Sequence, residues 1–361
     1  MTRVVLLGLD GFPHRAIRPD WTPRMWRLGQ DGGRAPEGGL TGKPSSTYPG
    51  FCTLLTGRMP QAHGVRTTGS QEGVLPAWAG TWTRVRVPTL FDACRTAGLR
   101  SVAVQGDHLM HPMLGTDACA WIWPPGGQPP PGTPLDEHGY PVNAAVRPPL
   151  LEAARERSLA FLFGHLNEAD TIGHDTGPES GAARRCYQET DAIVGEVLDA
   201  LQPDWGSTMV VIVSDHDMEA RTDRVPIDLL ADAEVRQVAQ DVVADGGAAL
   251  LQLRSGVSPE AAGQAVTAVP GVAGWSDGRD GMIIVDAQPG WIFDAWRLRF
   301  RGYHGGPATA RTVALVGGGH PDVPVVAAAI RTRRPHLADW APTIARVLDL
   351  RLQPLDGSAL G

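Results

Sequence analysis

Acidic and imidazole side chains stand at or just beyond the ends of several strand-like apolar runs. The runs "LLGLD" and "VVIVSDH" end in such side chains, "AFLFGHL" is followed by "NEADTIGHDTGP", and a Gly-flanked histidine stands in "RGYHGGP". The set consists of Asp10, Asp170, His174, Asp215, His216 and His304. Taken singly, an aspartate at a strand end is usually a turn or cap residue. Together, these carboxylate oxygens and imidazole nitrogens are donors suited to Zn²⁺, so the set favours a metal site.

A hydroxyl group in "GKPSSTYPGFCTLLTG" is the second candidate for chemistry. Thr47 precedes Pro49 and an apolar run at helical spacing, which predicts that it lies near a helix N-terminus. Free backbone N–H groups and the helix dipole favour an anionic group at such a place. The ordinary role of a hydroxyl there is to cap the helix. The residues alone leave both interpretations open.

These side chains need a sheet that brings strand ends together. Strand-like apolar runs alternate with helical patterns and lie at residues 4–10, 101–107, 159–166, 209–215 and 313–318. Helices are predicted from Pro23, from the Pro88 region to Gly98, over 180–202, and near the C-terminus in "HLADWAPTIARVLDL". This alternation predicts an α/β fold with a mostly parallel central sheet flanked by helices. In such sheets ligands bind beyond the carboxyl ends of the strands.

The pattern changes between about residues 225 and 300. There "AALLQLRSGVSPEAAGQAVTAVPGVAGW" predicts strand, turn, helix and strand, and "GMIIVDAQPGWIFDA" predicts a hairpin. We therefore expect one catalytic domain over residues 1–361 with a small α+β subdomain inserted at about 225–300. The Pro-rich segment 123–134 is predicted to be a loop or lid segment.

Composition excludes several classes of function. A net charge of −7 and a pI near 5.9, with no basic stripe, argue against binding a nucleic-acid duplex. No apolar run reaches the length that spans a membrane, and the five apolar residues near the start are too few for a signal-peptide core. We expect a cytoplasmic protein, and its oligomeric state stays open. The cysteines are far apart without CxxC spacing, which predicts reduced thiols that are mostly buried.

The motifs taken together resemble the alkaline phosphatase superfamily, in particular its type I phosphodiesterase/nucleotide pyrophosphatase branch. The resemblance runs in order through "LLGLDGF", "PSSTYPGFCTLLTGRMPQAHGV", "NEADTIGHDTGP", "VIVSDHDM" and "GYHGGP". It extends to "DWAPTIARVLDL" and so covers nearly the whole chain. The combination of D-x-x-G-H-x-x-G-P, SDH and Thr-x-Pro before "TLLTG" is its most specific part.

The resemblance implies two divalent metal ions, most simply Zn²⁺, and a nucleophile. One ion would be held by Asp170, His174 and His304. The other would be held by Asp10, Asp215 and His216, with the hydroxyl of Thr47 as a further ligand and as the attacking group. The implied reaction is hydrolysis of phosphodiester or pyrophosphate bonds of a nucleotide or similar small molecule through a phospho-threonine.

Two positions depart from the pattern that the resemblance implies. Gly50 stands where many relatives have an asparagine that donates to a phosphoryl oxygen, and it is expected to leave space for a bulky ester group. Asp217 stands where glycine is usual, and aspartate tolerates a left-handed backbone. A sulfatase is excluded because the segment from Thr47 to Phe51 lacks both the convertible Cys or Ser and the arginine.

Other functions remain open within these limits. They are a phosphonate hydrolase, a phosphomonoesterase and a catalytically inactive binding protein. Near Thr47 the sequence offers only two cations, Lys43 and Arg58, which favours diesters over dianionic monoesters. The aromatic residues Tyr48, Trp291, Trp296 and Tyr303 could stack on a base or simply pack.

Overall fold

A seven-stranded sheet forms the centre of the protein. The computed structural model describes residues 1–69, 74–222, 224–293 and 299–361. The strand order is β2-β15-β7-β1-β6-β4-β5. The strands are β1 (Arg3–Leu9), β2 (Gly33–Arg34), β4 (Ser101–Gln105), β5 (Trp121–Trp123), β6 (Phe161–Leu166), β7 (Thr208–Ser214) and β15 (Ala314–Gly318). The strands from β7 to β5 are parallel, and β15 runs antiparallel to β7. The predicted mostly parallel sheet is confirmed.

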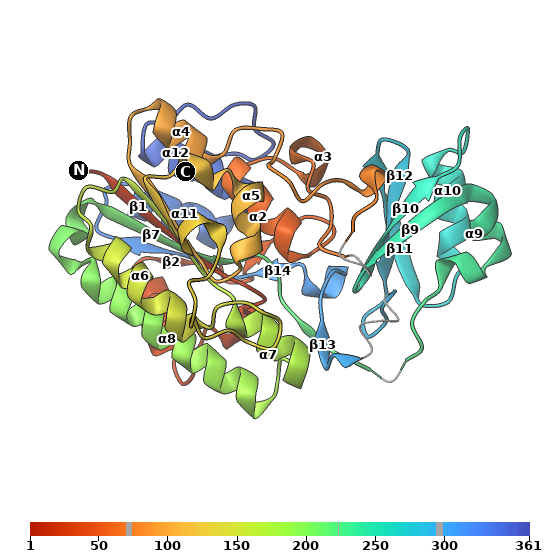
Figure 1. The fold of residues 1–361 in the computed structure, drawn as a ribbon, viewed down its shortest axis with the longest axis horizontal. Helices are drawn as coiled ribbons and strands as arrows, with labels where there is room; N and C mark the ends of the chain where they lie inside the picture. Colours follow the sequence, from red (N-terminus) through yellow and green to blue (C-terminus); the bar gives the residue numbers. More distant parts are fainter. Residues whose placement is uncertain (70–73, 223, 294–298) are drawn as a thin grey trace.

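The central strands are buried on both faces because their successive side chains enter two different cores. In β1, Val4 and Leu6 belong to one core, and Val5 and Leu7 belong to the other. One face is covered by α2 (Thr47–Thr56), α4 (Leu90–Thr96), α5 (His111–Leu114), α11 (Val323–Thr332) and α12 (Trp340–Val347). The other is covered by α1 (Pro23–Asp31), α6 (Asn143–Arg155) and α8 (Gly181–Ala200) (Figure 1). A continuous run of β-branched residues suits such a strand.

Helix α1 begins at Pro23 as predicted, but Thr22 does not cap it through its side chain. The hydroxyl of Thr22 donates to the carbonyl of Ala16 (2.8 Å) and accepts from the backbone N–H of Arg18 (3.1 Å).

Among the described residues, no helix is both long enough and apolar enough to cross a membrane.

The cysteine thiols form no disulfide. Cys52, Cys94 and Cys186 are buried, and Cys119 is partly buried. Burial raises the pKa of Cys94 to about 12, so this thiol stays protonated at neutral pH.

A second, smaller sheet lies within the 225–300 segment. Its order is β11-β12-β10-β9, and all its pairs are antiparallel. The strands are β9 (Ala239–Asp245), β10 (Ala248–Leu253), β11 (Val272–Arg279) and β12 (Met282–Ala287), and they pack with α9 (Ala233–Val238) and α10 (Pro259–Thr267) around a core of their own. This subdomain stands beside the main sheet (Figure 1).

The hairpin predicted in "GMIIVDAQPGWIFDA" is wrong. Its first half is β12, whose hairpin partner is the preceding strand β11. The turn between them contains Arg279 and Asp280 in left-handed conformation, followed by Gly281. The segment from Gln288 to Phe293 forms no strand, and residues 294–298 lie outside the described part of the chain. Periodicity alone did not show which neighbour β12 would pair with.

Candidate active site

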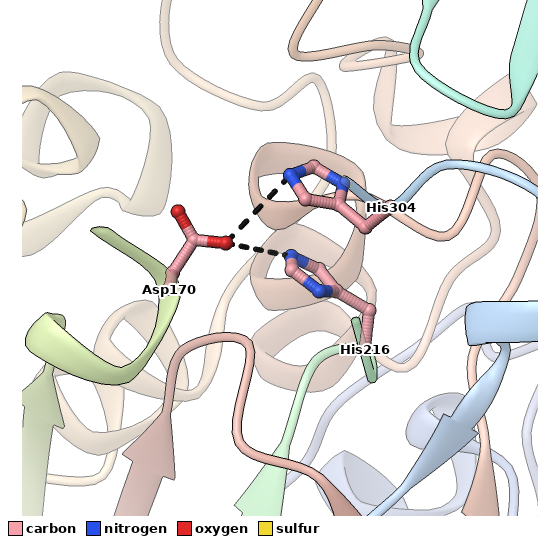
Figure 2. Close-up of side chains that lie close together, drawn as sticks. All are labelled: Asp170, His216 and His304. Carbon is pink, nitrogen blue, oxygen red and sulfur yellow. Dashed lines mark ion pairs between the residues drawn. The ribbon is translucent and has the colours of Figure 1, made fainter. Parts of the chain in front are cut away.

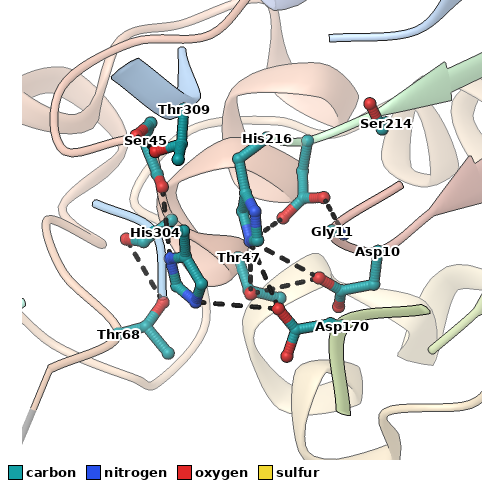
Figure 3. Close-up of polar contacts among 12 residues, drawn as sticks. Asp10, Gly11, Ser45, Thr47, Thr68, Asp170, Ser214, His216, His304 and Thr309 are labelled. Carbon is teal, nitrogen blue, oxygen red and sulfur yellow. Dashed lines mark hydrogen bonds and ion pairs between the residues drawn. The ribbon is translucent and has the colours of Figure 1, made fainter. Parts of the chain in front are cut away.

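The register of the three central strands places two carboxylates side by side. Leu9 is level with Leu166 of β6 and with Ser214 of β7. Asp10 and Asp215 therefore leave the sheet at the same edge, one residue beyond their strands. The backbone N–H of Gly11 donates to Asp215 Oδ1 at 3.2 Å, which fixes that carboxylate (Figure 3).

The third aspartate comes from α7 (Glu168–Thr176), which starts directly after β6. Asp170 lies in the first turn of this helix, where the dipole favours a negative charge. His174 follows one turn later, and its Nε2 lies 3.4 Å from Asp170 Oδ2. The i, i+4 spacing seen in the sequence thus becomes a direct contact.

His304 returns to the site through a short strand. β13 (Gly302–Tyr303) pairs with β8 (Glu219–Ala220), which follows β7 after a short turn. Ser45 and Gly305 exchange two backbone hydrogen bonds of 3.0 Å, which hold this segment against the loop before α2. The rings of His304 and His216 stack with centroids 3.9 Å apart.

The ligand atoms form two clusters that share one histidine. In the first, atoms of Asp10, Asp215 and His216 lie within 4.8 Å of one another. In the second, Asp170 Oδ1 lies 3.9 Å from His216 Nε2 and 3.7 Å from His304 Nε2 (Figure 2). His216 therefore reaches both groups, whereas the resemblance assigned it to the first alone. His174 contacts the second group through its Nε2, which lies beside Asp170 Oδ2.

The histidines present the correct nitrogen for binding a cation. Nδ1 of His174 lies 2.8 Å from the carbonyl of Gly302, and Nδ1 of His216 lies 2.9 Å from the carbonyl of Asp217. Nδ1 of His304 lies 3.3 Å from the carbonyl of Ser45. A carbonyl only accepts, so each Nδ1 carries the proton and each Nε2 keeps its lone pair for the centre of the site.

The carboxylates also fit a cation. Asp10 and Asp215 are completely buried. Burial raises the pKa of both far above the usual range, and the neighbouring carboxylate of Asp170 raises both further. A divalent cation would offset this repulsion and favour the charged forms. The donor set and its arrangement therefore fit the two-metal site that the resemblance implies.

Thr47 is the first residue of α2, as its sequence position predicts. Its hydroxyl lies 3.3 Å from Asp10 Oδ1 and 3.2 Å from His216 Nε2 (Figure 3). The hydroxyl thus stands beside the shared histidine and opens to a cleft. The cleft is lined by Asp10, Thr47, Tyr48, Thr68, Trp82, Asp107, His138, Tyr140, Asn167, Asp170, Thr171, His174, Phe300 and His304.

Comparison with known proteins now decides the family. A family model described as type I phosphodiesterase/nucleotide pyrophosphatase matches residues 4–272. The chain belongs to this family. A Schizosaccharomyces pombe protein described as an uncharacterized pyrophosphatase/phosphodiesterase is 22% identical over 238 aligned positions, and the match covers 61% of this chain and 45% of that protein. The chain thus spans less than half of the length of this curated relative.

Solved structures of the same family share the fold. Murine ectonucleotide pyrophosphatase/phosphodiesterase 5 has a TM-score of 0.71 and 18% identity, covering 99% of this chain and 97% of that chain. The human counterpart has a TM-score of 0.69 at 18% identity with the same coverage. A further murine structure (TM-score 0.71, 16% identity, 99% and 98% coverage) is described as an inactive threonine-to-alanine variant in complex with AMP. These likenesses confirm the fold class.

One site residue of this family member was missed from the sequence. Nε2 of the buried His165, in β6, lies 3.1 Å from Asp10 Oδ2. Its Nδ1 accepts from the backbone N–H of Asp107 (3.3 Å), so Nε2 carries the proton and donates to the carboxylate. The signal was present, because His165 is the one strongly polar residue in "AFLFGHL".

The expectation that Gly50 leaves space in the cleft is wrong. A Cβ added at Gly50 would lie 2.9 Å from Asp215 Cβ, and Gly50 is not among the described residues that line the cleft. The missing side chain lets α2 approach the end of β7. Sequence alone could not show which way this helix face points.

Asp217 does not need a left-handed backbone. The described non-glycine residues with positive φ are Arg279, Asp280 and Asp349. Asp217 instead accepts from the guanidinium of Arg15 (2.6 Å) and from the N–H of Met218 (2.7 Å). It anchors the turn that carries His216.

The cations and aromatic residues that the sequence offered as possible contacts of a substrate lie in different parts of the structure. Lys43 pairs with Asp286, and Arg58 pairs with Asp356 at 3.1 Å. Tyr48 lines the cleft, whereas Trp291 packs against the core of the subdomain and Tyr303 is buried in β13. Trp296 lies outside the described residues.

Proposed function

We propose that this protein hydrolyses phosphodiester or pyrophosphate bonds of a nucleotide or similar small molecule, with Thr47 as nucleophile. The observation that carries the proposal is a hydroxyl at a helix N-terminus beside two groups of candidate metal ligands, with Thr47 Oγ1 3.3 Å from Asp10 Oδ1 and 3.2 Å from Nε2 of His216, the histidine that both groups share. Membership of the type I phosphodiesterase/nucleotide pyrophosphatase family supports the reaction class. The murine relative in complex with AMP supports a nucleotide as substrate.

Two divalent ions, Zn²⁺ by the donor types, would be held by these residues. Asp10, Asp215 and His216 would hold one, and Asp170, His174 and His304 the other, with His216 within reach of both. A cation pair supplies, when bound, Lewis-acid stabilisation of phosphoryl charge and of the departing oxygen. Thr47 would also be a ligand through its hydroxyl oxygen.

The residues of the chain position the reacting groups. The hydroxyl of Thr47 has two acceptors, His216 Nε2 at 3.2 Å and Asp10 Oδ1 at 3.3 Å, and its proton passes to one of them as the oxygen attacks phosphorus. Attack forms the Thr47 Oγ1–P bond and breaks the bond from phosphorus to the ester or anhydride oxygen, which takes up a proton and leaves as an alcohol or as a phosphate. Water then cleaves the phospho-threonine and restores the hydroxyl. Because the substrate is oriented in a buried site, positioning and electrostatics supply most of the rate.

The charges around the cleft favour diesters over monoesters. A monoester dianion carries one more negative charge, which specialised enzymes bind with an extra cation, often arginine. Among the described residues, neither Lys nor Arg lines the cleft. Lys43 and Arg58, the cations near Thr47 in the sequence, are each paired with an aspartate. The lining instead offers the rings of Tyr48, Trp82 and Phe300, which suit a base or another flat leaving group.

The test compares kcat/KM for bis-p-nitrophenyl phosphate and p-nitrophenyl phosphate at one pH with zinc-loaded protein. We expect the diester to be preferred, and we expect about two zinc ions per chain by elemental analysis. Thr47→Ala should keep its zinc and lose at least about 1,000-fold in kcat, whereas Thr47→Ser should retain part of the activity.

Each alternative has its own result. A clear preference for the monoester would show that the same site belongs to a phosphomonoesterase and not to a phosphodiesterase. Release of phosphate from phosphonoacetate, without diester turnover, would indicate cleavage of a C–P bond. Active protein without bound metal, or Thr47→Ala with wild-type rates, would contradict the proposed mechanism. Zinc binding without turnover of any of these substrates would indicate a catalytically inactive binding protein.

A further inference from the structure

A buried carboxylate of the inserted subdomain reaches the loop that carries the nucleophile. Asp245 is the last residue of β9 and is completely buried. Its Oδ2 accepts from Ser46 Oγ (2.8 Å), Thr67 Oγ1 (2.7 Å) and the backbone N–H of Thr68 (3.0 Å). The contact therefore connects the subdomain to two loops of the main domain.

One of these partners occupies a special position. Ser46 is the N-cap residue of α2, directly before Thr47. A serine there ordinarily accepts from an N–H of the first turn, yet the side chain of Ser46 makes no capping bond. Its hydroxyl donates to Asp245 instead. The N–H of Tyr48 donates to Thr68 Oγ1 (3.0 Å), so a neighbour that Asp245 also holds takes over part of the capping.

The turn after β9 contacts the other side of the site as well. The backbone N–H of Gly247 donates to the carbonyl of His304 at 2.8 Å. The same turn of the subdomain thus borders both the nucleophile loop and the segment of His304. Asp245 itself lies outside the set of cleft-lining residues and has no place in the proposed chemistry.

We propose that Asp245 is a positioning residue that holds Thr47 in register with Asp10 and His216 by fixing Ser46 and Thr68. The inference rests on the proposed function, in which Thr47 is the nucleophile. Without the carboxylate, the hydroxyl of Ser46 is free to rotate and cap α2, and the first turn loses its anchor. A displacement of about 1 Å at a reacting group costs up to about 100-fold in rate.

The test uses Asp245→Asn, which keeps the shape of the side chain and replaces the carboxylate by an amide, whose oxygen is a weaker acceptor for the three hydrogen bonds. The matched control is Asp241→Asn, four residues before Asp245 on the same strand, whose carboxylate accepts from the indole N–H of Trp78 (3.0 Å) and not from the loop of Thr47. We expect Asp245→Asn to lower kcat for bis-p-nitrophenyl phosphate by about 10- to 100-fold, with KM within about 2-fold. Zinc content and Tm should stay near wild type, and the control should leave kcat unchanged.

A double-variant cycle tests the route through Ser46. Ser46→Ala should lower kcat in the wild-type background and have a smaller further effect in the Asp245→Asn background, because Asp245→Asn weakens the hydrogen bond that Ser46→Ala removes. If Asp245→Asn does not fold, Ser46→Ala alone tests the positioning role. It removes a single hydroxyl group, and the proposal requires that it still lowers kcat.

The outcomes separate this inference from the proposed function. Active wild-type protein with an unchanged kcat in Asp245→Asn, or in Ser46→Ala, overturns the positioning role. Loss of zinc or a large fall in Tm in Asp245→Asn, in proportion to lost activity, assigns Asp245 a structural role and also overturns it. Wild-type protein that hydrolyses none of the substrates contradicts the proposed function, and this inference falls with it.

Discussion

At the scale of single residues, hydrogen bonds decide which atom of each ligand faces the site. Three histidines give their Nδ1 proton to backbone carbonyls and keep Nε2 for the centre. His165 has the opposite tautomer, because a backbone N–H donates to its Nδ1 and its Nε2 donates to Asp10 Oδ2. His165 thus occupies one carboxylate oxygen of Asp10 and leaves Oδ1 for Thr47 and a cation.

The expected consequence is a weaker metal site when this donor is removed. His165→Leu should weaken zinc binding by about 10- to 100-fold, the usual cost of losing such an outer partner. His165→Gln offers an amide donor near the position of Nε2 and should restore part of the affinity. Chelator competition measures the zinc dissociation constant directly, so the result does not depend on turnover.

The control for this prediction is His111→Leu. His111 is also buried, and it contacts Gln105, Thr116 and the carbonyl of Trp123, none of them a predicted ligand. Its loss should change stability without changing zinc affinity. Equal zinc affinity in wild type and His165→Leu would contradict the role given to His165.

At the scale of elements, the approach of α2 to the end of β7 positions Thr47 beside the carboxylates. Gly50 makes this approach possible, since a Cβ there would lie 2.9 Å from Asp215 Cβ. Gly50→Ala should therefore push the helix away from the strand. We expect the free energy of unfolding to fall by about 1–3 kcal/mol, as for other overpacked sites, and both zinc affinity and kcat to fall with it. Chemical denaturation and zinc titration measure the two effects.

The matched control is Gly181→Ala at the start of α8. A Cβ there would meet only the guanidinium of Arg185 at 3.6 Å, an ordinary contact. Alanine in an unstrained helical position is neutral or slightly stabilising. If Gly50→Ala behaved like Gly181→Ala, the close packing of α2 on Asp215 would not matter for the site.

At the scale of the whole molecule, buried neutral histidines should make stability depend on pH. Burial lowers the pKa of His63 to about 3 and those of His14 and His111 to about 4. In the unfolded chain these groups bind protons from about pH 6.5 downward. The unfolded state therefore takes up more protons, so the stability they provide is present above pH 6.5 and is lost as pH falls toward 4.

The measurement compares the unfolding free energy of wild type and of His63→Leu as a function of pH. The pH effects of the site carboxylates are the same in both proteins and cancel in the difference. Between pH 6.5 and pH 5 the wild type should lose roughly 2 kcal/mol of unfolding free energy more than the variant. His63 lies in the core beside Thr53 and is fully buried, which is why protonation in the native state is disfavoured. Parallel pH curves for the two proteins would show that His63 titrates normally.

Local sequence patterns determined much of this protein. Apolar runs of β-branched residues predicted the central strands, and the polar residues after them predicted where the site would lie. Thr47 was expected at a helix start because proline and small residues precede an apolar helical run, and it is the first residue of α2. These features depend on residues that are close together in the sequence, so the sequence alone is enough to predict them.

Only the tertiary structure decided which side chains meet. The order β7-β1-β6 brings Asp10, Asp215 and the start of α7 to one edge, and no local pattern specifies strand order. His216 reaches both clusters because the His304 segment folds back onto it. Asp245 lies 199 positions from Ser46 in sequence, yet it holds that residue with a 2.8 Å hydrogen bond. Such contacts arise from the packing of the subdomain against the main sheet, which hydrophobic periodicity does not encode.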